Sequence, residues 1–298
     1  MTLCAKVSRR DYENVKGRLK REAKFLPFVE GDYIYVPVSE PFGQVVECSP
    51  PQRENRRLSS LFPGVRGYYV VGHAAVIKHR EGIDLENVAK FIAATNRRVK
   101  SVFLKEKVEG EYRVNKLRLV WGEDNSVVKF RENGLTFQVD LREVFVDPSM
   151  AQVRAEMGRN LKGGRVLDVF AGYGATSLHL AREGTQVVAG DLNPEAVKWA
   201  LWNAKLNKLL HKVDVIRYDG HSLPFRDGAF EKCVADNPTS LWEFEEEICR
   251  VCKSVIGLAL AESPPKGWKV INEYSKELSI FQGPLGCSKE GHQSLSAP

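Results

Sequence analysis

The stretch from Val166 to Ser177 constrains the fold of this chain more than any other part of the sequence. It reads VLDVFAGYGATS, an apolar run that ends in an acid and continues into two closely spaced glycines. Such a run is typical of a buried parallel strand whose following turn opens a helix, where backbone N–H groups and the helix dipole favour a carboxylate or phosphate of a ligand. The sequence therefore predicts an α/β sheet with a ligand at the end of this strand.

The C-terminal half alternates between strand and helix patterns at the spacing of a doubly wound parallel sheet. A helix expected at 149–161 leads into this region through Lys162-Gly163-Gly164. The expected strands are 165–170, 186–190, 212–218 and 230–235. We therefore predict a Rossmann-type domain at residues 149–298.

The first 148 residues are expected to form two small α+β units. Pro50-Pro51 and the charged string at 52–57 indicate a linker within 46–62, so the proposed units are 1–62 and 63–148. The expected elements are a strand at 3–7, a helix at 11–23 and a strand at 32–38, then strands at 68–77 and 101–107 around a helix at 85–94, and a hairpin of 127–130 with 137–139 through Asn133-Gly134.

The net charge of +6 is confined to the N-terminal half of the chain. Residues 1–150 hold 26 Lys and Arg against 20 Asp and Glu, whereas residues 151–298 hold 18 of each. A basic half beside a neutral half fits a module that binds a polyanion joined to a small-molecule site, although a solvated basic surface explains the excess equally well. The cations of the first unit are the candidates for such binding: Arg9, Arg10, Lys16, Arg18, Lys20 and Arg21.

The six cysteines are scattered, and the N-terminus shows no charged leader followed by an apolar stretch. We therefore expect a protein that stays in the cytoplasm, with reduced thiols instead of a disulfide framework. Cys249 and Cys252 have no second Cys-x-x-Cys beside them, so they are expected to lie one turn apart on a helix. No apolar run approaches the roughly 20 residues of a membrane-spanning helix.

The residues at the first strand end favour S-adenosylmethionine over a dinucleotide. The third glycine of a dinucleotide fingerprint would fall at Ser177, and Asp168 would lie badly beside a pyrophosphate. Gly172 and Gly174 would let the ligand approach the backbone. We therefore predict a methyltransferase cofactor site in which Phe170 also takes part.

The ends of the next two strands offer further acids. Asp191 can accept from a ribose diol, since Asn193 is available to cap the helix that follows. Asp219 can accept from an adenine amino group, or it can serve only in turn formation. Leu192 and Gly220, which follow these acids, complete the predicted cofactor site.

The fourth strand leads into Asp236, Asn237 and Pro238. An amide or acid before a proline at this edge can orient a planar nitrogen nucleophile rigidly against the sulfonium methyl group. The alternative is a strand-to-helix turn in which Asp236 or Asn237 is the cap. We predict the first, because this position coincides with the open end of the site.

With these motifs the chain resembles the archaeal and eukaryotic tRNA (guanine-37-N1)-methyltransferases, whose relatives include the aminocarboxypropyltransferases of the wybutosine pathway. The likeness covers nearly the whole chain. The segments that carry it are 1–7, 31–37, 108–114, 131–134, 168–177, 191–194 and 203–207.

The resemblance implies a small N-terminal tRNA-binding domain, a middle domain and a class I methyltransferase domain, with tRNA as partner. It implies that Arg113 stabilises negative charge that develops on the guanine, and that Asn237 positions the base. It implies that Arg154 lies on a helix facing the substrate. No metal, membrane or obligate protein partner is implied.

Two departures from the family pattern concern the target atom. The family has an arginine at the position of Ser149, and at that of Val153 a glutamate presumed to accept the guanine N1 proton. We expect Asp147 or Asp236 to take over this role if N1 is the target. The alternatives are transfer to another tRNA position or atom, aminocarboxypropyl transfer, and a catalytically silent tRNA-binding paralogue.

Overall fold

The computed structural model describes residues 2–51, 58–79, 82–110, 112, 114–275 and 277–287. The chain divides into two compact units, Met1–Leu61 and Phe62–Pro298, and each is described by itself. None of the helices in the described part is long and apolar enough to cross a membrane.

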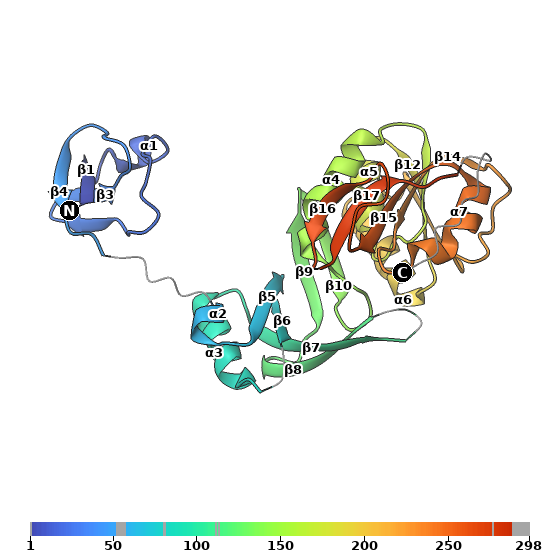
Figure 1. The fold of residues 1–298 in the computed structure, drawn as a ribbon, viewed down its shortest axis with the longest axis horizontal. Helices are drawn as coiled ribbons and strands as arrows, with labels where there is room; N and C mark the ends of the chain where they lie inside the picture. The colour runs from blue at the N-terminus through green and yellow to red at the C-terminus, as the bar shows by residue number, and fades with distance from the viewer. Residues whose placement is uncertain are drawn as a thin grey trace. The chain divides into compact units, whose positions relative to one another are not determined.

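The first unit is a four-stranded antiparallel sheet in the order β2-β3-β1-β4 (Figure 1). Its small core consists of Ala5, Leu19, Val36 and Val38. The strands are β1 (Thr2–Ser8), β2 (Phe28–Glu30), β3 (Tyr33–Pro37) and β4 (Val45–Cys48). The predicted strands at 3–7 and 32–38 are confirmed, whereas β4 lies where the linker was expected to begin.

The predicted helix at 11–23 is wrong, because only α1 (Tyr12–Val15) forms. The chain leaves the helix before Gly17, a residue that weakens helices. It then buries Leu19, which is 7% exposed, and pairs Arg21 with Val38 at the end of β3. Burial of an apolar side chain and sheet pairing thus outweigh the helical pattern. The charged string at 52–57 lies outside the described residues.

Helix α2 (Leu58–Leu61) is the last element of the first unit. The second unit begins with a four-stranded sheet in the order β5-β6-β7-β8. Strands β6 and β7 are parallel and are joined by α3 (Leu85–Thr95), which buries Val88, Ala89 and Ile92. The helix predicted at 85–94 is therefore confirmed. The strands are β5 (Val65–Val71), β6 (Ala74–His79), β7 (Ser101–Glu109) and β8 (Val114–Gly122).

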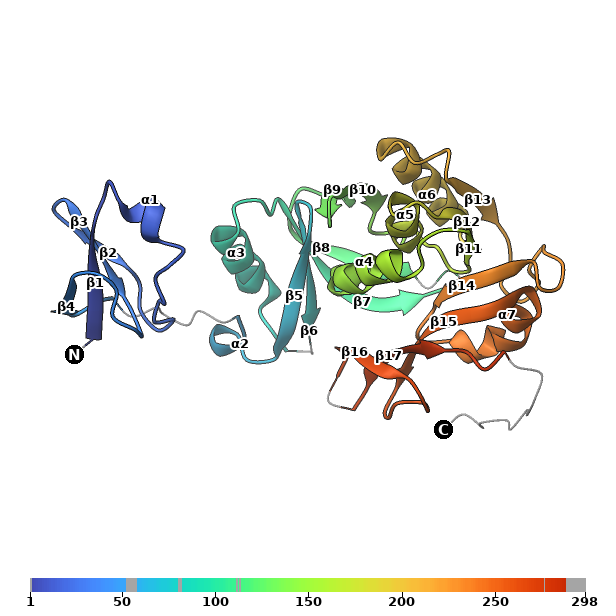
Figure 2. The same ribbon diagram turned by 90° about the horizontal axis from the view of Figure 1, so that it is seen from above.

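A seven-stranded sheet of the order β13-β12-β11-β14-β15-β17-β16 forms the C-terminal part. The five strands from β13 to β15 are parallel, and β17 is antiparallel to both of its neighbours. The dinucleotide-binding order 3-2-1-4-5-6 lacks such an inserted strand. The predicted Rossmann-type parallel sheet is therefore confirmed, although β15, β16 and β17 were not predicted; Figure 2 shows β16 and β17 together at one edge.

The elements of this part have the following bounds. The strands are β11 (Arg165–Asp168), β12 (Gln186–Asp191), β13 (Val213–Arg217), β14 (Phe230–Asp236), β15 (Cys252–Ala261), β16 (Lys269–Glu273) and β17 (Ser279–Pro284). The helices are η1 (Pro148–Met150), α4 (Ala151–Asn160), α5 (Ala175–Arg182), α6 (Pro194–Leu206), η2 (Leu241–Phe244) and α7 (Glu245–Val251).

A hairpin of β9 (Val127–Glu132) and β10 (Leu135–Asp140) lies between the two sheets in sequence. Its turn is Asn133-Gly134, with φ of 46° and 89°, as the sequence predicts. Positive φ at both residues suits the twist of an antiparallel pair.

Side chains of α6 hydrogen-bond to the backbone of β10. Asn203 Oδ1 accepts from Gln138 N at 2.8 Å, and its Nδ2 donates to Tyr173 O at 3.0 Å. Asn207 accepts from Thr136 N at 2.9 Å and donates to Thr136 O at 2.7 Å. Because Asn203 is fully buried, these bonds join the hairpin to the glycine turn after β11.

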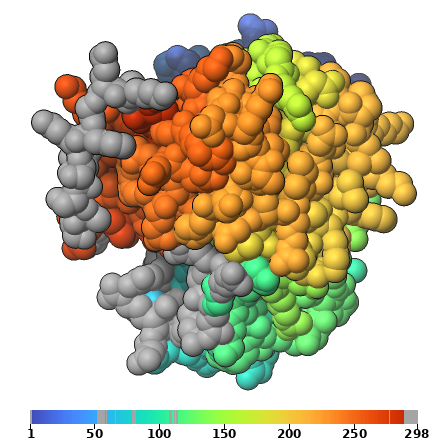
Figure 3. All heavy atoms as spheres, turned by 90° about the vertical axis from the view of Figure 1, so that its right-hand side faces the viewer, coloured from blue at the N-terminus to red at the C-terminus, as the bar shows by residue number. Residues whose placement is uncertain are grey.

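One hydrophobic core runs through the second unit. It joins Phe103 of β7 and Phe137 of β10 to Val166 and Val187 of the seven-stranded sheet. In Figure 3 the yellow C-terminal segments adjoin the green middle segments directly along the right-hand side. The proposed boundary between residues 148 and 149 stays a prediction.

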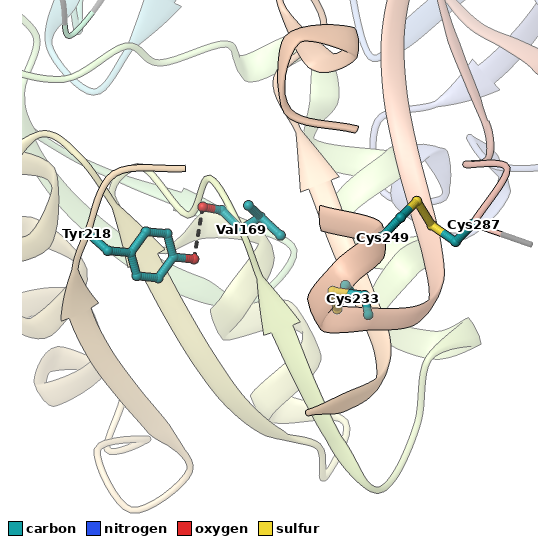
Figure 4. Close-up of a disulfide and its surroundings, with 6 residues drawn as sticks. Val169, Tyr218, Cys233, Cys249 and Cys287 are labelled. Atoms are coloured by element: carbon teal, nitrogen blue, oxygen red, sulfur yellow. Dashed lines mark hydrogen bonds between the residues drawn. A yellow bond between two sulfur atoms is a disulfide. The ribbon is translucent and has the colours of Figure 1, made fainter. Parts of the chain in front are cut away.

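The expectation of reduced thiols is wrong, because all six cysteines form disulfides. The fold brings together cysteines that are distant in sequence, at Cα separations of 5.8, 6.1 and 4.9 Å, within the range a disulfide needs. Cys249 of α7 and Cys252 of β15 lie on different elements and have different partners. The pairs are Cys4–Cys48, Cys233–Cys252 and Cys249–Cys287, the last of which is drawn in Figure 4.

We predict that the Cys233→Ala/Cys252→Ala variant unfolds with a free energy lower by about 3 kcal/mol, because the unfolded chain regains the entropy of a loop spanning 19 residues. Urea unfolding followed by tryptophan fluorescence measures the change. The Cys4→Ala/Cys48→Ala variant is the control, since its disulfide lies in the other unit and its loss should leave this transition in place. Equal midpoints for the Cys233→Ala/Cys252→Ala variant and the unchanged protein would contradict the prediction.

Candidate active site

The candidate site lies at the carboxyl ends of the parallel strands, where the strand order reverses around β11. This strand pairs with β12 on one side and β14 on the other. Ligands of open α/β sheets bind outside the carboxyl ends at such a switch point. Each of the three strands ends in an acid, and a fourth acid follows β13: Asp168, Asp191, Asp236 and Asp219.

The turn after β11 requires its glycines. Gly172 and Gly174 have φ of 54° and 85°, in the left-handed region. A Cβ on Gly174 would lie 3.3 Å from Ala200 Cα, so a side chain there would also push α6 away. The turn is held from the next strand, since Asp191 Oδ2 accepts from Gly172 N at 2.8 Å.

Asp168 lies beneath this turn and is fully buried. Its Oδ2 accepts from Ser177 Oγ at 2.6 Å, whereas its Oδ1 has no hydrogen-bond partner among the described residues. Burial raises its pKa to about 7, against the lowering effect of the Ser177 bond, and the nearby Asp236 and Asp191 raise it further. A cationic or hydrogen-bond-donating ligand group would favour the ionised form of this carboxyl group.

Asp191 is half-buried at the end of β12. Besides Gly172 N, it accepts from Asn193 N at 2.9 Å, and Asn193 in turn caps α6 by accepting from Glu195 N at 2.9 Å. The predicted cap at Asn193 is therefore present. Leu192, between these two residues, is half-buried.

The ring of Tyr218 crosses Gly190 and ties β13 to β11. A Cβ on Gly190 would lie 2.0 Å from the ring, so only glycine fits. The hydroxyl donates to Val169 O at 3.1 Å, as Figure 4 shows. This bond fixes the strand ends that carry Asp168 and Asp219, one on each side of β12.

The residues after β13 lie against aromatic rings. Asp219 is exposed, and Gly220 is buried against Phe170 and Phe244, whose ring centroids are 4.9 Å apart. Asp219 accepts from the backbone and the ring of His221. Three predicted cofactor residues, Phe170, Asp219 and Gly220, are thus together.

Asp236, Asn237 and Pro238 are half-buried at the end of β14. Two backbone bonds fix this loop: Ser240 N donates to Asn237 O at 3.2 Å and Leu260 N donates to Pro238 O at 2.8 Å. Burial raises the pKa of Asp236 to about 6, against the lowering effect of Arg154.

Asp147, the other predicted acid, caps η1. Its Oδ1 accepts from Ser149 N at 2.9 Å and from Ser149 Oγ at 2.6 Å. Ser149 Oγ also accepts from Asn272 Nδ2 at 2.8 Å, so Ser149 joins η1 to β16.

Arg154 is 4% exposed and pairs with Glu132, which is 6% exposed. Two bonds of 2.8 and 2.7 Å join the guanidinium to the carboxylate, and a third of 3.0 Å reaches Asp147 O. His179 lies 3.7 Å from the same carboxylate, and burial lowers its pKa. Arg154 is therefore placed in the interior, where it orders the start of α4 instead of presenting its charge to RNA.

The predicted RNA-binding cations of the first unit are all exposed. Lys16 and Lys20 form surface ion pairs with Glu13 and Glu40, which contribute little to stability. Arg113, the predicted catalytic arginine, lies outside the described residues. The exposed cations of this unit are Arg9, Arg10, Lys16, Arg18, Lys20 and Arg21.

Comparison with known proteins agrees with this geometry. Residues 128–256 match the family described as the TRM5/TYW2 methyltransferase domain. The tRNA (guanine(37)-N(1))-methyltransferase Trm5b of Pyrococcus abyssi is 30% identical over 238 residues, which cover 72% of each chain. The chain belongs to the TRM5 family.

A solved structure of this relative and a second TRM5 relative extend the comparison. The crystal structure of Trm5b from Pyrococcus abyssi superposes with a TM-score of 0.68 at 25% identity, over 95% of this chain and 98% of that chain. The human tRNA (guanine(37)-N(1))-methyltransferase is 40% identical over 114 residues, 38% of this chain and 22% of the human protein. TRM5 family members use S-adenosylmethionine, which carries both a sulfonium and an ammonium group.

The residues at the strand ends fit this cofactor. Four carboxyl groups along one edge disfavour a pyrophosphate and favour a cationic ligand. The unpartnered Oδ1 of Asp168 is a further acceptor at this edge. Such a constellation can hold a positively charged donor and, at the β14 loop, a planar base.

Sequence reasoning assigned no role to several residues that the TRM5 fold brings to this site. Glu132 lies in a motif recognised only by resemblance, and Tyr173 lies between the two glycines of the turn with its hydroxyl buried and unpartnered among the described residues. His221 and Phe244 also join the site. The position of Tyr173 between Gly172 and Gly174 could have predicted from the sequence that it lies at the site. Glu132 becomes recognisable only through its contact with α4.

We predict that Arg154→Met lowers the free energy of unfolding by about 3–5 kcal/mol, because it leaves the carboxylate of Glu132 buried and unpaired. The double variant Glu132→Met/Arg154→Met should recover most of this loss, since no buried charge remains. Urea unfolding of both single variants and the double variant measures the coupling. Additive losses in the double variant would show that the buried pair does not carry the effect.

Proposed function

We propose that this chain is an S-adenosylmethionine-dependent tRNA methyltransferase that transfers a methyl group to N1 of guanosine 37. The observation that carries the proposal is the rigid loop of Asp236, Asn237 and Pro238 at the same strand edge as Asp168 and Asp191. A cofactor site and a base-orienting loop at one edge allow direct transfer between the two ligands. Membership of the TRM5 family supports tRNA as the substrate.

The cofactor residues act mainly by binding and orientation. Asp191 accepts from the ribose hydroxyls, Asp219 accepts from the adenine amino group, and the turn of Gly172 and Gly174 admits the methionine moiety close to the backbone. Phe170, Leu192 and Gly220 enclose the nucleoside, and Asp168 supports the turn from below. S-Adenosylmethionine supplies the electrophilic methyl group.

The base is oriented by the β14 loop. Because the backbone carbonyls of Asn237 and Pro238 are both bonded, the loop backbone is fixed, and the Asn237 side chain projects from a fixed point at this edge. Arg113 stabilises negative charge on the guanine during transfer. Holding two reactants in alignment removes much of the entropic barrier of a bimolecular step.

Asp236 is the stronger of the two candidates for the acceptor of the N1 proton. Val153 packs against the core and has no proton-accepting group. Asp147 is engaged as the cap of η1, whereas Asp236 has a pKa raised to about 6, which suits a general base near neutral pH.

The tRNA is held by several parts of the chain. Residues 1–62 form the tRNA-binding domain, with its exposed arginines and lysines on the phosphate backbone, and 63–148 and 149–298 form the middle and catalytic domains. The protein acts in the cytoplasm. Arg154, buried against Glu132, assists by ordering η1 and α4.

Incubation of the protein with unmodified tRNA and methyl-labelled S-adenosylmethionine tests the function, followed by nucleoside mapping with mass spectrometry. The expected product is 1-methylguanosine at position 37. Methylation at another atom or position would correct the target, an aminocarboxypropyl adduct would identify the other transferase class, and tRNA binding without any transfer would indicate a silent paralogue.

We predict that kcat/KM falls as the pH is lowered through about 6, because protonated Asp236 cannot accept the N1 proton. The pKa is raised above its usual value, so the active ionised form is present only above that pH. Asp236→Asn should lower kcat by about 10²- to 10⁴-fold and remove this acid limb of the pH profile, the fall in rate at low pH. Single-turnover rates from pH 5 to 8 measure both effects.

Asp147→Asn is the matched comparison, since it removes a carboxylate of the same size from the η1 cap. It should keep the pH limb, with a change of rate below about tenfold. Loss of the limb in Asp147→Asn together with a normal profile in Asp236→Asn would assign the base to Asp147 instead.

A further inference from the structure

Three segments meet beside the end of β13: the residues after β11, those after β13, and η2. They contribute Phe170, Asp219 with His221, and Phe244. We infer that His221 is a positioning residue that aims the free oxygen of Asp219 at the 6-amino group of a purine, while Phe170 and Phe244 form the wall of the base pocket. The inference rests on the proposed cofactor and names what makes its site selective for adenine.

The hydrogen bonds of Asp219 leave one oxygen available. Oδ1 accepts from His221 N at 2.9 Å and lies 2.8 Å from His221 Nδ1, so one residue occupies this oxygen twice. Oδ2 has no hydrogen bond to the described residues. These bonds from His221 also lower the pKa of Asp219, which keeps the carboxylate ionised and able only to accept.

The Asp219–His221 contact does little for stability. The two side chains are 52% and 58% exposed, and ion pairs at such positions contribute little to the free energy of folding. What the contact does determine is the rotation of the carboxylate, because two donors on Oδ1 fix the direction of Oδ2. The arrangement therefore suits ligand recognition better than folding.

Two aromatic side chains lie against Gly220, the residue that follows Asp219. The rings of Phe170 and Phe244 meet edge to face at 4.9 Å, and the ring of His221 lies 4.3 Å from that of Phe244. A Cβ on Gly220 would lie 2.9 Å from Phe170 Cε1, so glycine lets the backbone after Asp219 approach the wall. The apolar wall and the carboxylate acceptor of Asp219 are therefore brought to the same place by the short segment from Asp219 to His221.

A fixed carboxylate discriminates strongly between purines. It accepts a hydrogen bond from a 6-amino group. A 6-oxo group is itself an acceptor, so its oxygen and the carboxylate oxygen repel each other. Sites built to bond a particular polar group reject analogues that lack it more effectively than apolar pockets reject an extra group. The expected ligand class is an adenine nucleoside with a free 6-amino group.

Titration calorimetry with two product analogues tests the inference. The probes are S-adenosylhomocysteine and S-inosylhomocysteine, which has an oxo group in place of the amino group. The unchanged protein should prefer the adenosyl compound by about 10- to 100-fold, the range of one hydrogen bond to a charged acceptor. His221→Ala should reduce this preference to within about threefold, and Asp219→Asn should reverse its direction, since an amide can donate to the oxo group.

Matched variants separate positioning from a loss of structure. His221→Asn retains a side-chain donor and should recover most of the selectivity. Phe244→Leu should weaken both probes alike and leave their ratio unchanged. His211→Ala removes an exposed histidine before the amino end of β13, whereas Asp219 follows the carboxyl end of the same strand, and it should change neither affinity nor selectivity.

Wild-type selectivity in His221→Ala would overturn the inference, as would equal loss of both probes. Binding of neither probe by the unchanged protein would overturn it together with the proposed cofactor. Selective binding of the adenosyl compound without methylation of any tRNA would refute the proposed substrate and leave the inference in place.

Discussion

The side-chain amide of Asn203 holds together the parts of the structure on which the site depends. Fully buried on α6, it bonds to Gln138 N of the hairpin and to Tyr173 O in the glycine turn. A buried amide that loses one partner leaves polar atoms unpaired, which is costly. The hairpin, α6 and the cofactor turn are therefore expected to move and unfold as one body, and the domain matched by the TRM5 family begins at the hairpin for a physical reason.

The second constraint is the set of acids at the strand ends. Burial raises the pKa of Asp168 to about 7 and that of Asp236 to about 6. The ionised forms of the carboxyl groups at this edge are therefore disfavoured. Positive groups stabilise these ionised forms, whether the group is the buried guanidinium of Arg154 or part of a bound cationic ligand. The same edge therefore favours the sulfonium group of S-adenosylmethionine.

Much of the fold and part of the site could be predicted from local patterns. The glycine turn, the hairpin at Asn133-Gly134 and helix α3 follow from backbone preferences that act over a few residues. The helix predicted at 11–23 does not form, because Leu19 packs into the core of the first unit and Arg21 pairs with Val38, just after β3. The prediction of reduced thiols was wrong because disulfide pairing depends on which segments the fold makes neighbours. Roles for Glu132, His221 and Phe244 also require contacts between segments that are distant in sequence.

The class of sheet, the order of the acids along it and the need for glycine at residues 172 and 174 follow from the amino-acid sequence alone, since these depend on periodicity and on local backbone conformation. Contacts between distant segments bury Arg154 against Glu132 and insert β17 between β15 and β16. These features depend on burial and on contacts between residues that are distant in sequence. The most stable position of each side chain is set there by atoms that no local sequence pattern specifies.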